Sequence, residues 1–303
     1  MVAYVVEKLE DVTLDIANPK GRLAGYDLMS PFVWTEDKTY RLLVRVLPRP
    51  LGAGDPTGTI WSGESDDGIC FRMSDEPAIV PGPNPDDAGG CEDPTVVRGD
   101  KGNYLVFYTG VDAERAQGAL LVAKGPDLAS LKEQRVMLKA PPGEGNIKEA
   151  TLARGSDGQY RLFYEYAKDN ASRIGMATGP TVEGPWTVVD DPFTIRQGSW
   201  DNWHLSTGPI VQTEGEDPVM FYNGATADAR WRIGWISFSG DFTKVTGRGL
   251  EPLLMPPPAE DRTATDIAFA ASCLEMGEDI WLYYSLEDRI LRRARIARYS
   301  PGG

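Results

Sequence analysis

The amino-acid sequence predicts an all-β fold, a five-bladed β-propeller formed as a single domain by residues 1–303. The main observation is an internal repeat: five segments share a short apolar run, a polar turn and an aromatic-rich strand. The aromatic strands begin 64, 56, 58 and 62 residues apart. The second observation is that no helical periodicity interrupts the repeats, and three to four strands per repeat is typical of propeller blades. The predicted blades cover approximately residues 27–75, 91–135, 148–190, 205–245 and 265–298.

Each repeat is centred on an aromatic strand that follows a polar, mostly acidic turn. The strands are Tyr40–Val46, Tyr104–Gly110, Tyr160–Tyr166, Pro218–Gly224 and Ile280–Leu286. The turns before them read TEDKT, RGDKGN, RGSDGQ, TEGED and EMGED, and such turns between apolar strands predict β-hairpins. A further strand-like run follows, as in GALLVAKG and RIGMATGP. A β-sandwich with coincidental spacing is the alternative, which the regularity of the repeat disfavours.

The sixth position of every aromatic strand is polar although its neighbours are apolar. These residues are Arg45, Thr109, Glu165, Asn223 and Ser285. Buried strands rarely carry a polar side chain at the same place five times, so we expect the five positions to face a polar pocket at the mouth of a central channel. For each residue taken singly, a hydrogen bond to neighbouring backbone is the alternative.

Composition narrows the classes of partner and cofactor. The formal net charge is −14, which disfavours nucleic-acid and membrane partners and favours a neutral ligand. One histidine and three cysteines without metal-like spacing predict no metal site and no cofactor, with a structural cation on the propeller axis as an open alternative. The chain shows no signal-peptide pattern and no apolar run long enough to span a bilayer, so we expect a cytoplasmic protein. The sequence predicts no oligomeric state.

The stretch GCEDPTVV at residues 90–97 places two adjacent carboxylates at the start of an apolar strand. Carboxylates resist burial unless they are paired or used. Asp93 is the stronger candidate for a functional residue on the axis, because Pro94 stiffens the chain directly after it. An aspartate that caps a turn is the alternative. Because side chains alternate along a strand, Glu92 is expected to point the other way.

Several segments resemble glycoside hydrolase family 130, whose members are five-bladed propellers that act on β-mannosides. The segments are GCEDPTVV, YTGVD (108–112), the GPIV and FYNG pair (208–224), VTGRGLEPLLMP (245–256) and YYSLED (283–288). More distantly, ATGPTVEGPW (177–186) is similar to the five-bladed furanosidases of families 43 and 32. The resemblance to family 130 runs from about Ser30 to Arg298.

The resemblance implies roles for four residues of this chain. It makes Asp93 the proton donor or the central sugar-binding carboxylate. It makes Arg45 a ligand of sugar hydroxyls, and Lys148 and Asp288 match the family's lysine of the third blade and its last aspartate.

The chain also departs from the family pattern. Thr95 stands where the family's phosphorylases usually have arginine, and Asn223 stands where they carry a histidine that helps to hold phosphate. Ser30-Pro31 replaces the asparagine-proline motif of the first blade. Because a phosphorylase needs a cationic cradle for its anion, the first two departures favour water over phosphate as the attacking group.

Glycosidic cleavage ordinarily needs a second carboxyl group on the opposite face of the sugar. Glu149 occupies the spot in the third blade that Asp93 occupies in the second, and it matches the acid/base glutamate of the furanosidases. A surface Lys148–Glu149 pair is the alternative. Glu287 and Asp288 are alternative bases, although two acids after a strand are often a solvated turn. Asp27 is a further candidate in the first blade, or simply the start of a loop.

We therefore expect a glycoside hydrolase that acts on β-mannosides or related short oligosaccharides with inversion, with Asp93 as proton donor and Glu149, Glu287 or Asp288 activating water. The expected sugar-binding residues are Arg45, Asp27, Lys148, Glu165, His204, Asn223 and Asp288. His204 is included because Trp200 and Trp203 flank it, although a structural histidine is the alternative. The alternative functions are a mannoside phosphorylase, an arabinofuranosidase-like furanosidase and a non-catalytic glycan-binding propeller.

Overall fold

The computed structural model describes residues 3–15, 23, 25–99, 101–141 and 144–299. These residues form strands, turns and two single 3-10 turns, η1 (Leu128–Ser130) and η2 (Ala259–Asp261). The all-β prediction is therefore confirmed. Within the described ranges, no helix is long and apolar enough to cross a membrane. The predicted domain, residues 1–303, also includes short segments outside the described ranges.

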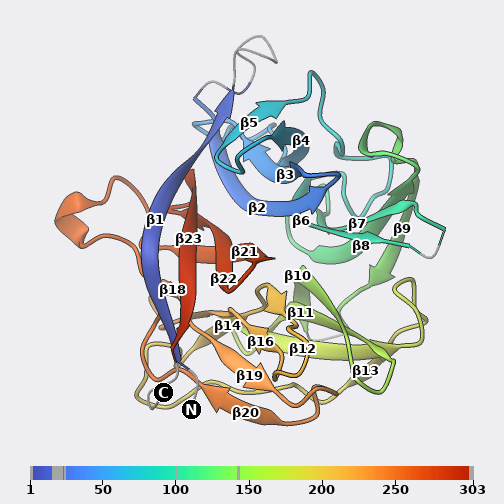
Figure 1. The fold of residues 1–303 in the computed structure, drawn as a ribbon. Coiled ribbons are helices and arrows are strands. Elements are labelled where there is room, and N and C mark those ends of the chain that lie inside the picture. Colours follow the sequence, from blue (N-terminus) through green and yellow to red (C-terminus); the bar gives the residue numbers. More distant parts are fainter. Residues whose placement is uncertain (1–2, 16–22, 24, 100, 142–143, 300–303) are drawn as a thin grey trace.

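The largest sheet joins the beginning and the end of the chain (Figure 1). Its eight strands run in the order β2 (Asp27–Glu36), β3 (Thr39–Leu47), β4 (Thr59–Ser65), β5 (Cys70–Met73), β1 (Ala3–Asp15), β23 (Ile290–Tyr299), β22 (Asp279–Leu286) and β21 (Ala268–Met276). Strand β1 pairs antiparallel with β23 along most of its length and parallel with β5 at Thr13–Asp15. Strand β1 therefore joins the N-terminal strands β2–β5 and the C-terminal strands β21–β23 in one sheet.

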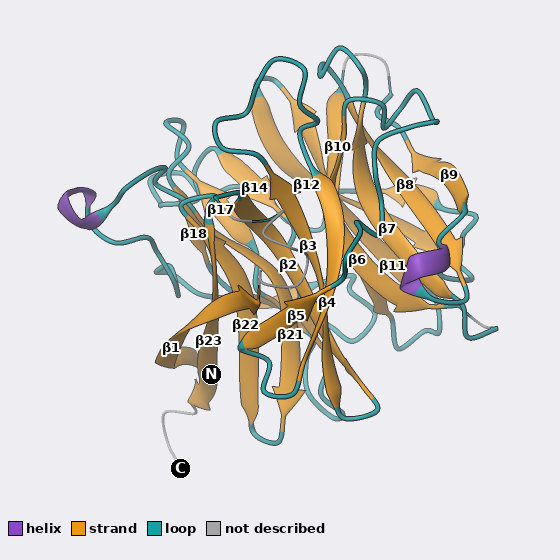
Figure 2. Cartoon of the chain, turned by 90° about the horizontal axis from the view of Figure 1, so that it is seen from above, coloured by secondary structure: helices purple, strands orange, loops and turns teal. Residues whose placement is uncertain are grey.

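Four smaller sheets make up the rest, and Figure 2 shows their strands from above. One contains β6 (Gly90–Arg98), β7 (Tyr104–Val111), β8 (Gly118–Gly125) and β9 (Glu133–Leu138), and the next contains β10 (Gly145–Arg154), β11 (Tyr160–Lys168), β12 (Ala171–Gly179) and β13 (Thr187–Val189). The fourth repeat is divided into β14 (His204–Ser206), β17 (Asn223–Ala225) and β18 (Trp231–Ile233), and β15 (Ile210–Val211), β16 (Val219–Met220), β19 (Ile236–Phe238) and β20 (Val245–Arg248).

The predicted aromatic strands are the second strands of the repeats, and their register is the same in each. Their polar sixth residues lie opposite Met29, Glu92, Lys148, Ser206 and Phe269 of the preceding strands. Just beyond this point the pairing shifts in β2, β6, β10 and β21, and the strand is interrupted between β14 and β15. Ser30, Asp93 and Glu149 occupy this irregularity with φ values of 50°, 51° and 53°. The repeat therefore includes a β-bulge that bends the chain and redirects a side chain.

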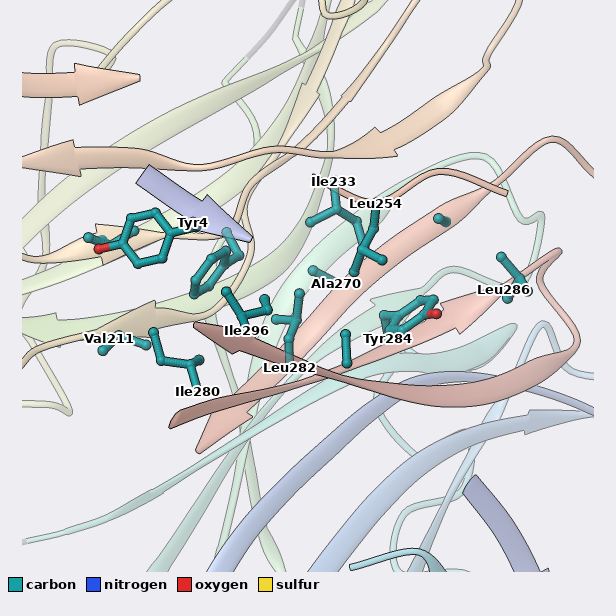
Figure 3. Close-up of a cluster of buried hydrophobic side chains, with 14 residues drawn as sticks. Tyr4, Val211, Ile233, Leu254, Ala270, Ile280, Leu282, Tyr284, Leu286 and Ile296 are labelled. Atoms are coloured by element: carbon teal, nitrogen blue, oxygen red, sulfur yellow. The ribbon is translucent and has the colours of Figure 1, made fainter. Parts of the chain in front are cut away.

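The hydrophobic core lies in clusters that combine neighbouring sheets. In the cluster of Figure 3, Tyr4 of β1 packs with Leu282 and Ile296 of the last strands and with Ile233 of β18. Burying each such side chain contributes about 1.5–3 kcal/mol, so the aromatic and aliphatic positions of the repeats hold the sheets together.

Side chains link successive repeats near the bulges. Ser30 Oγ donates to Asp93 Oδ1 at 2.6 Å, Thr95 Oγ1 donates to the Ala150 carbonyl at 2.6 Å, and Thr151 Oγ1 donates to the Gly208 carbonyl at 3.1 Å. Asn223 then bonds the backbone of Ala270, and Ser272 Oγ donates to the Pro31 carbonyl at 2.8 Å. We call these five contacts the inter-strand links. They close a ring that fixes the bulges relative to one another.

Candidate active site

Five carboxyl groups and two cations gather where the bulges meet, and we call them the axial acid cluster: Glu92, Asp93, Glu149, Glu165, Asp288, Arg45 and Lys148. They come from strands β3, β6, β10 and β11 and from the turn after β22. The structure thus brings together six of the residues that the sequence predicts for the site. It adds Glu92, which the alternation argument excluded.

Glu92 and Asp93 both face the cluster. Arg45 donates to Glu92 Oε1 at 2.7 Å and lies 3.8 Å from Asp93 Oδ1. The expectation that Glu92 points away is wrong, because Asp93 has a positive φ and the bulge breaks the strict alternation of side chains. Neighbouring residues can then turn to the same side.

Glu92 pairs with both cations of the cluster. Besides Arg45, it accepts a hydrogen bond from Lys148 Nζ at 3.1 Å. Burial alone would raise the pKa of Glu92, but the charges of Arg45 and Lys148 hold that pKa below its usual value. Glu92 is therefore ionised, and its charge is the main partner of the two cations.

Glu149 lies beside Asp93 in the most acidic part of the cluster. Burial raises its pKa well above the usual value, and the charges of Asp93 and Glu165 raise it further, together with a hydrogen bond shared with Asp93. The Glu149 backbone N–H donates to Thr109 Oγ1 at 3.3 Å, so the polar sixth residue of β7 helps to hold the bulge. The Glu149 carboxyl therefore holds its proton to higher pH than an ordinary glutamate.

Glu165 and Asp288 complete the cluster. Ser172 Oγ donates to Glu165 at 2.8 Å, and Thr265 Oγ1 donates to Asp288 at 3.4 Å. Burial raises the pKa of both carboxyls, although Lys148 opposes the rise at Glu165 and Arg45 opposes it at Asp288. The cluster thus contains two further acids with raised pKa values beside Asp93 and Glu149.

Three of the predicted residues are held by other contacts. Glu287 accepts hydrogen bonds from Thr263 N and Oγ1 at 2.8 and 2.9 Å, and Asp27 pairs with Arg49 at 2.7 Å. The fully buried Asn223 uses its side-chain amide on backbone groups of Thr207 and Ala270. These contacts favour structural roles for all three side chains.

His204 also has a structural partner. Its Nδ1 accepts a hydrogen bond from the Ser172 N–H at 3.1 Å, and its ring lies 5.5 Å from that of Trp231. Burial, with a smaller effect of Arg173, lowers its pKa and favours the neutral ring. Of its predicted neighbours, Trp200 stacks on Tyr222, whereas Trp203 is 40% exposed.

Sequence reasoning missed Ser30 as a partner of Asp93. The signal was present, because Ser30 has the same position in the first repeat as Asp93 and Glu149 in the next two. In the described part of the chain, no group of three or more His, Cys, Asp or Glu residues is arranged to hold a metal ion. The chemistry that the cluster itself offers is proton transfer between carboxyl groups.

Comparison with known proteins identifies the family that the chain resembles. The glycoside hydrolase 130 family model, described as β-1,4-mannooligosaccharide phosphorylase, matches residues 56–297. The chain is 25% identical over 229 residues to a β-1,2-mannobiose phosphorylase of Thermoanaerobacter sp., which covers 74% of this chain and 72% of that protein.

Solved structures show the same fold. The β-1,2-mannobiose phosphorylase of Listeria innocua, in complex with β-1,2-mannobiose, aligns with a TM-score of 0.74 at 17% identity over 96% of this chain and 97% of that one. A second structure belongs to the GH130 family of mannoside phosphorylases, which contains glycoside hydrolases that target β-1,2-mannosidic linkages in Candida mannan. It aligns with a TM-score of 0.71 at 21% identity over 92% of this chain and 85% of that one.

Proposed function

The chain belongs to the glycoside hydrolase 130 family, and from this premise we propose that it hydrolyses a β-mannosidic bond in a short oligosaccharide. The observation that carries the proposal is the geometry of the axial acid cluster: five carboxyls share two cations, Glu92 binds both of them, and burial raises the pKa of Glu149 beside Asp93. A carboxyl with a raised pKa is suited to act as a general acid, which cleavage of a glycosidic bond requires.

We also propose that the fold is a five-bladed propeller. The common register of the five second strands and the closed ring of inter-strand links support this count. It requires dividing the eight-stranded sheet at the parallel β1–β5 pair and combining the two short sheets of the fourth repeat into one blade.

The roles of the two central acids differ from the sequence-based expectation. The sequence predicts Asp93 as the donor, whereas burial and the nearby charges raise the pKa of Glu149. We assign Glu149 as the acid of the free enzyme, with Asp93 beside it, held by Ser30 and close to Arg45. The proton reaches the leaving oxygen directly or through a sugar hydroxyl.

Asp288 is the proposed base. It reaches the cluster from the turn after β22, an element far in sequence from β6 and β10, so it can approach the sugar from another side. The oxygen of water forms a bond to the anomeric carbon while the bond to the leaving oxygen breaks. The leaving oxygen takes the Glu149 proton and Asp288 takes a proton from water, so the step balances.

Phosphorolysis is the second candidate, because the 25%-identical relative is a phosphorylase. In that reaction phosphate attacks the anomeric carbon and the product is mannose 1-phosphate. The occupation of Arg45 and Lys148 by Glu92 favours hydrolysis, since an anion would compete with Glu92 for both cations.

The test is to incubate the purified protein with β-1,2- and β-1,4-mannobiose with and without inorganic phosphate. Free mannose formed at the same rate in both conditions is the expected result, and Glu149→Gln should remove it. Mannose 1-phosphate formed only when phosphate is present would establish the second candidate. Binding of both disaccharides without turnover would contradict both reactions and favour a glycan-binding protein.

A further inference from the structure

We propose that the stacked rings of His204 and Trp231 bind the second sugar ring of the substrate, the ring next to the mannosyl unit that the axial acid cluster holds. This inference deepens the proposed function and rests on it for the identity of the sugar. It gives a role in recognising the leaving sugar to the fourth repeat, which contributes no member of the axial acid cluster.

His204 and Trp231 lie in one row across the sheet of β14, β17 and β18, with Ala225 between them. His204 pairs with Ala225, and Ala225 pairs with Trp231. The side chains of directly paired residues project from the same face of a sheet. Because the fully buried Ala225 carries only a methyl group, the two rings meet beside it, with centroids 5.5 Å apart and planes 33° apart. The row therefore forms one continuous aromatic surface over two strands that are not neighbours in the sheet.

This row lies nearer the ends of the strands than the axial acid cluster does. In the fourth repeat, the polar sixth residue Asn223 pairs with Ser206 and Ile233, and the row lies two positions before each of them. The first strands of the repeats begin at the end where the turn after β22 carries Asp288. Two strand positions span about 6.6 Å, which is comparable to the length of one pyranose ring. A disaccharide whose mannosyl ring reaches the acids therefore places its second ring at the row.

Ser172 connects the row to the axial acid cluster on the side of the third repeat. Its backbone N–H donates to His204 Nδ1 at 3.1 Å, and its hydroxyl donates to Glu165 Oε1 at 2.8 Å. One residue therefore fixes the imidazole relative to a carboxyl of the cluster.

Phe269 connects the row to the fifth repeat. Its ring lies 5.2 Å from that of Trp231 in an edge-to-face contact. It pairs with the sixth residue of its aromatic strand, as Glu92 and Lys148 do in theirs. Phe269 therefore lies at the level of the cluster and supports the indole one level above it.

The exposed parts of the row offer the two features that bind a sugar ring. Both residues are partly exposed. Because His204 Nδ1 accepts a hydrogen bond and the lowered pKa favours the neutral imidazole, the ring carries its proton on Nε2. Among the described residues this Nε2–H has no hydrogen-bond partner, so it is free to donate to a sugar hydroxyl. A donor beside an aromatic face matches the hydroxyl-bearing edge and the apolar face of a pyranose.

The alternative is that the two rings only pack the fourth repeat against its neighbours, and matched variants separate the two roles. His204→Asn keeps an acceptor near the place of Nδ1 for the Ser172 N–H but has no counterpart of the Nε2–H. His204→Gln keeps a donor near Nε2 but loses that acceptor. Trp231→Leu removes the aromatic face, and Trp231→Phe keeps one. Tyr299→Leu is the control, because Tyr299 is 57% exposed at the opposite end of β23.

The experiment measures binding of mannose and of β-1,2- and β-1,4-mannobiose by isothermal titration calorimetry. Each variant is made in the Glu149→Gln background, so that bound disaccharide is not turned over. Trp231→Leu should weaken the binding of mannobiose about tenfold through loss of the stacking contact, and the binding of mannose should not change. His204→Asn should also weaken only mannobiose. His204→Gln, Trp231→Phe and Tyr299→Leu should bind mannobiose much as the parent does.

Two results would overturn the inference and leave the proposed function intact, since turnover by the wild type tests that function separately. Equal losses of mannose and mannobiose affinity in Trp231→Leu would place the indole at the first ring. Unchanged affinity for both sugars in Trp231→Leu and His204→Asn would leave the row with a packing role alone. A selective loss for mannobiose in a protein without turnover would support the inference and contradict hydrolysis, whereas a parent that binds none of the three sugars would contradict both.

Discussion

Two clusters of charged residues in this molecule shift the pKa of a central carboxyl in opposite directions. In the axial acid cluster, five carboxyls share two cations, and burial raises the pKa of Glu149. The fully buried Asp201 is surrounded instead by Arg196 at 3.0 Å, Arg248 at 2.6 Å and the Tyr222 hydroxyl at 2.7 Å. We call this second group the Asp201 cluster.

The two pKa shifts differ in direction because the two clusters differ in the number of cations and hydrogen-bond donors for each carboxyl. Burial alone would raise the pKa of Asp201, but hydrogen bonds from Tyr222 and Arg196 and the charge of Arg248 hold it below its usual value. Asp201 therefore stays ionised to lower pH than an ordinary aspartate. Glu149 has few cations nearby for the number of carboxyls around it, so its pKa is raised instead.

Replacing the proton carrier should have the largest effect. Glu149→Gln removes the acid while keeping the shape of the side chain, so kcat on β-mannobiose should fall about 10²–10⁴-fold. Its thermal midpoint at neutral pH should rise, because on folding the wild-type carboxyl must either bury a charge or take up a proton, and the amide does neither. Glu64→Gln, at an acid of β4 with a 50% exposed side chain, is the control and should leave both quantities unchanged. A Glu149→Gln variant with wild-type kcat would remove Glu149 from the reaction.

Asp201→Asn should have the opposite effects: a loss of stability with little change in activity. It leaves Arg196 and Arg248 without their buried carboxylate, and removal of one partner of a buried ion pair costs about 3–5 kcal/mol of unfolding free energy. Urea denaturation measures this loss. Activity per folded molecule should stay close to the wild type, since Asp201 does not belong to the axial acid cluster. Equal stability of variant and wild type would mean that the two arginines find other partners.

The pH dependence of the unfolding free energy should reveal the raised pKa of Glu149, which distinguishes the axial acid cluster from the Asp201 cluster. The Glu149 pKa is higher in the folded than in the unfolded state, so between the two pKa values the unfolded chain binds fewer protons. The contribution of Glu149 to stability is therefore fully present below about pH 4.5 and is lost as the pH rises toward the folded-state pKa. The difference in unfolding free energy between wild type and Glu149→Gln should show this decline. A difference independent of pH would mean an unperturbed Glu149.

Tyr222→Phe should have the smallest effect. It removes one of the donors to Asp201 but leaves both arginines and the stacking of ring 222 on Trp200, with ring centroids 5.6 Å apart. The expected loss is about 1–2 kcal/mol, since the hydrogen bond ends on a charged group. Thermal denaturation measures it, and a loss as large as that of Asp201→Asn would show that the hydroxyl rather than the arginines holds the carboxylate.

The repeats and most members of the site can be predicted from the sequence because they depend on local patterns. Aromatic strands after polar turns place Arg45 and Glu165 at equivalent positions, and the EDP motif identifies Asp93. The family resemblance adds Lys148 and Asp288. All five residues lie in the axial acid cluster.

Only the tertiary structure decides how these residues act. The direction of Glu92 depends on a left-handed backbone at Asp93, which reverses the alternation expected of a regular strand. The raised pKa of Glu149 depends on charges brought from β6, β10 and β11, and Ser30 reaches Asp93 across 63 residues of sequence. Sequence by itself determines which side chains repeat with the strands, because strand pairing follows local pattern. The directions of the pKa shifts come from long-range contacts, because electrostatic interactions depend on distance in space and on burial.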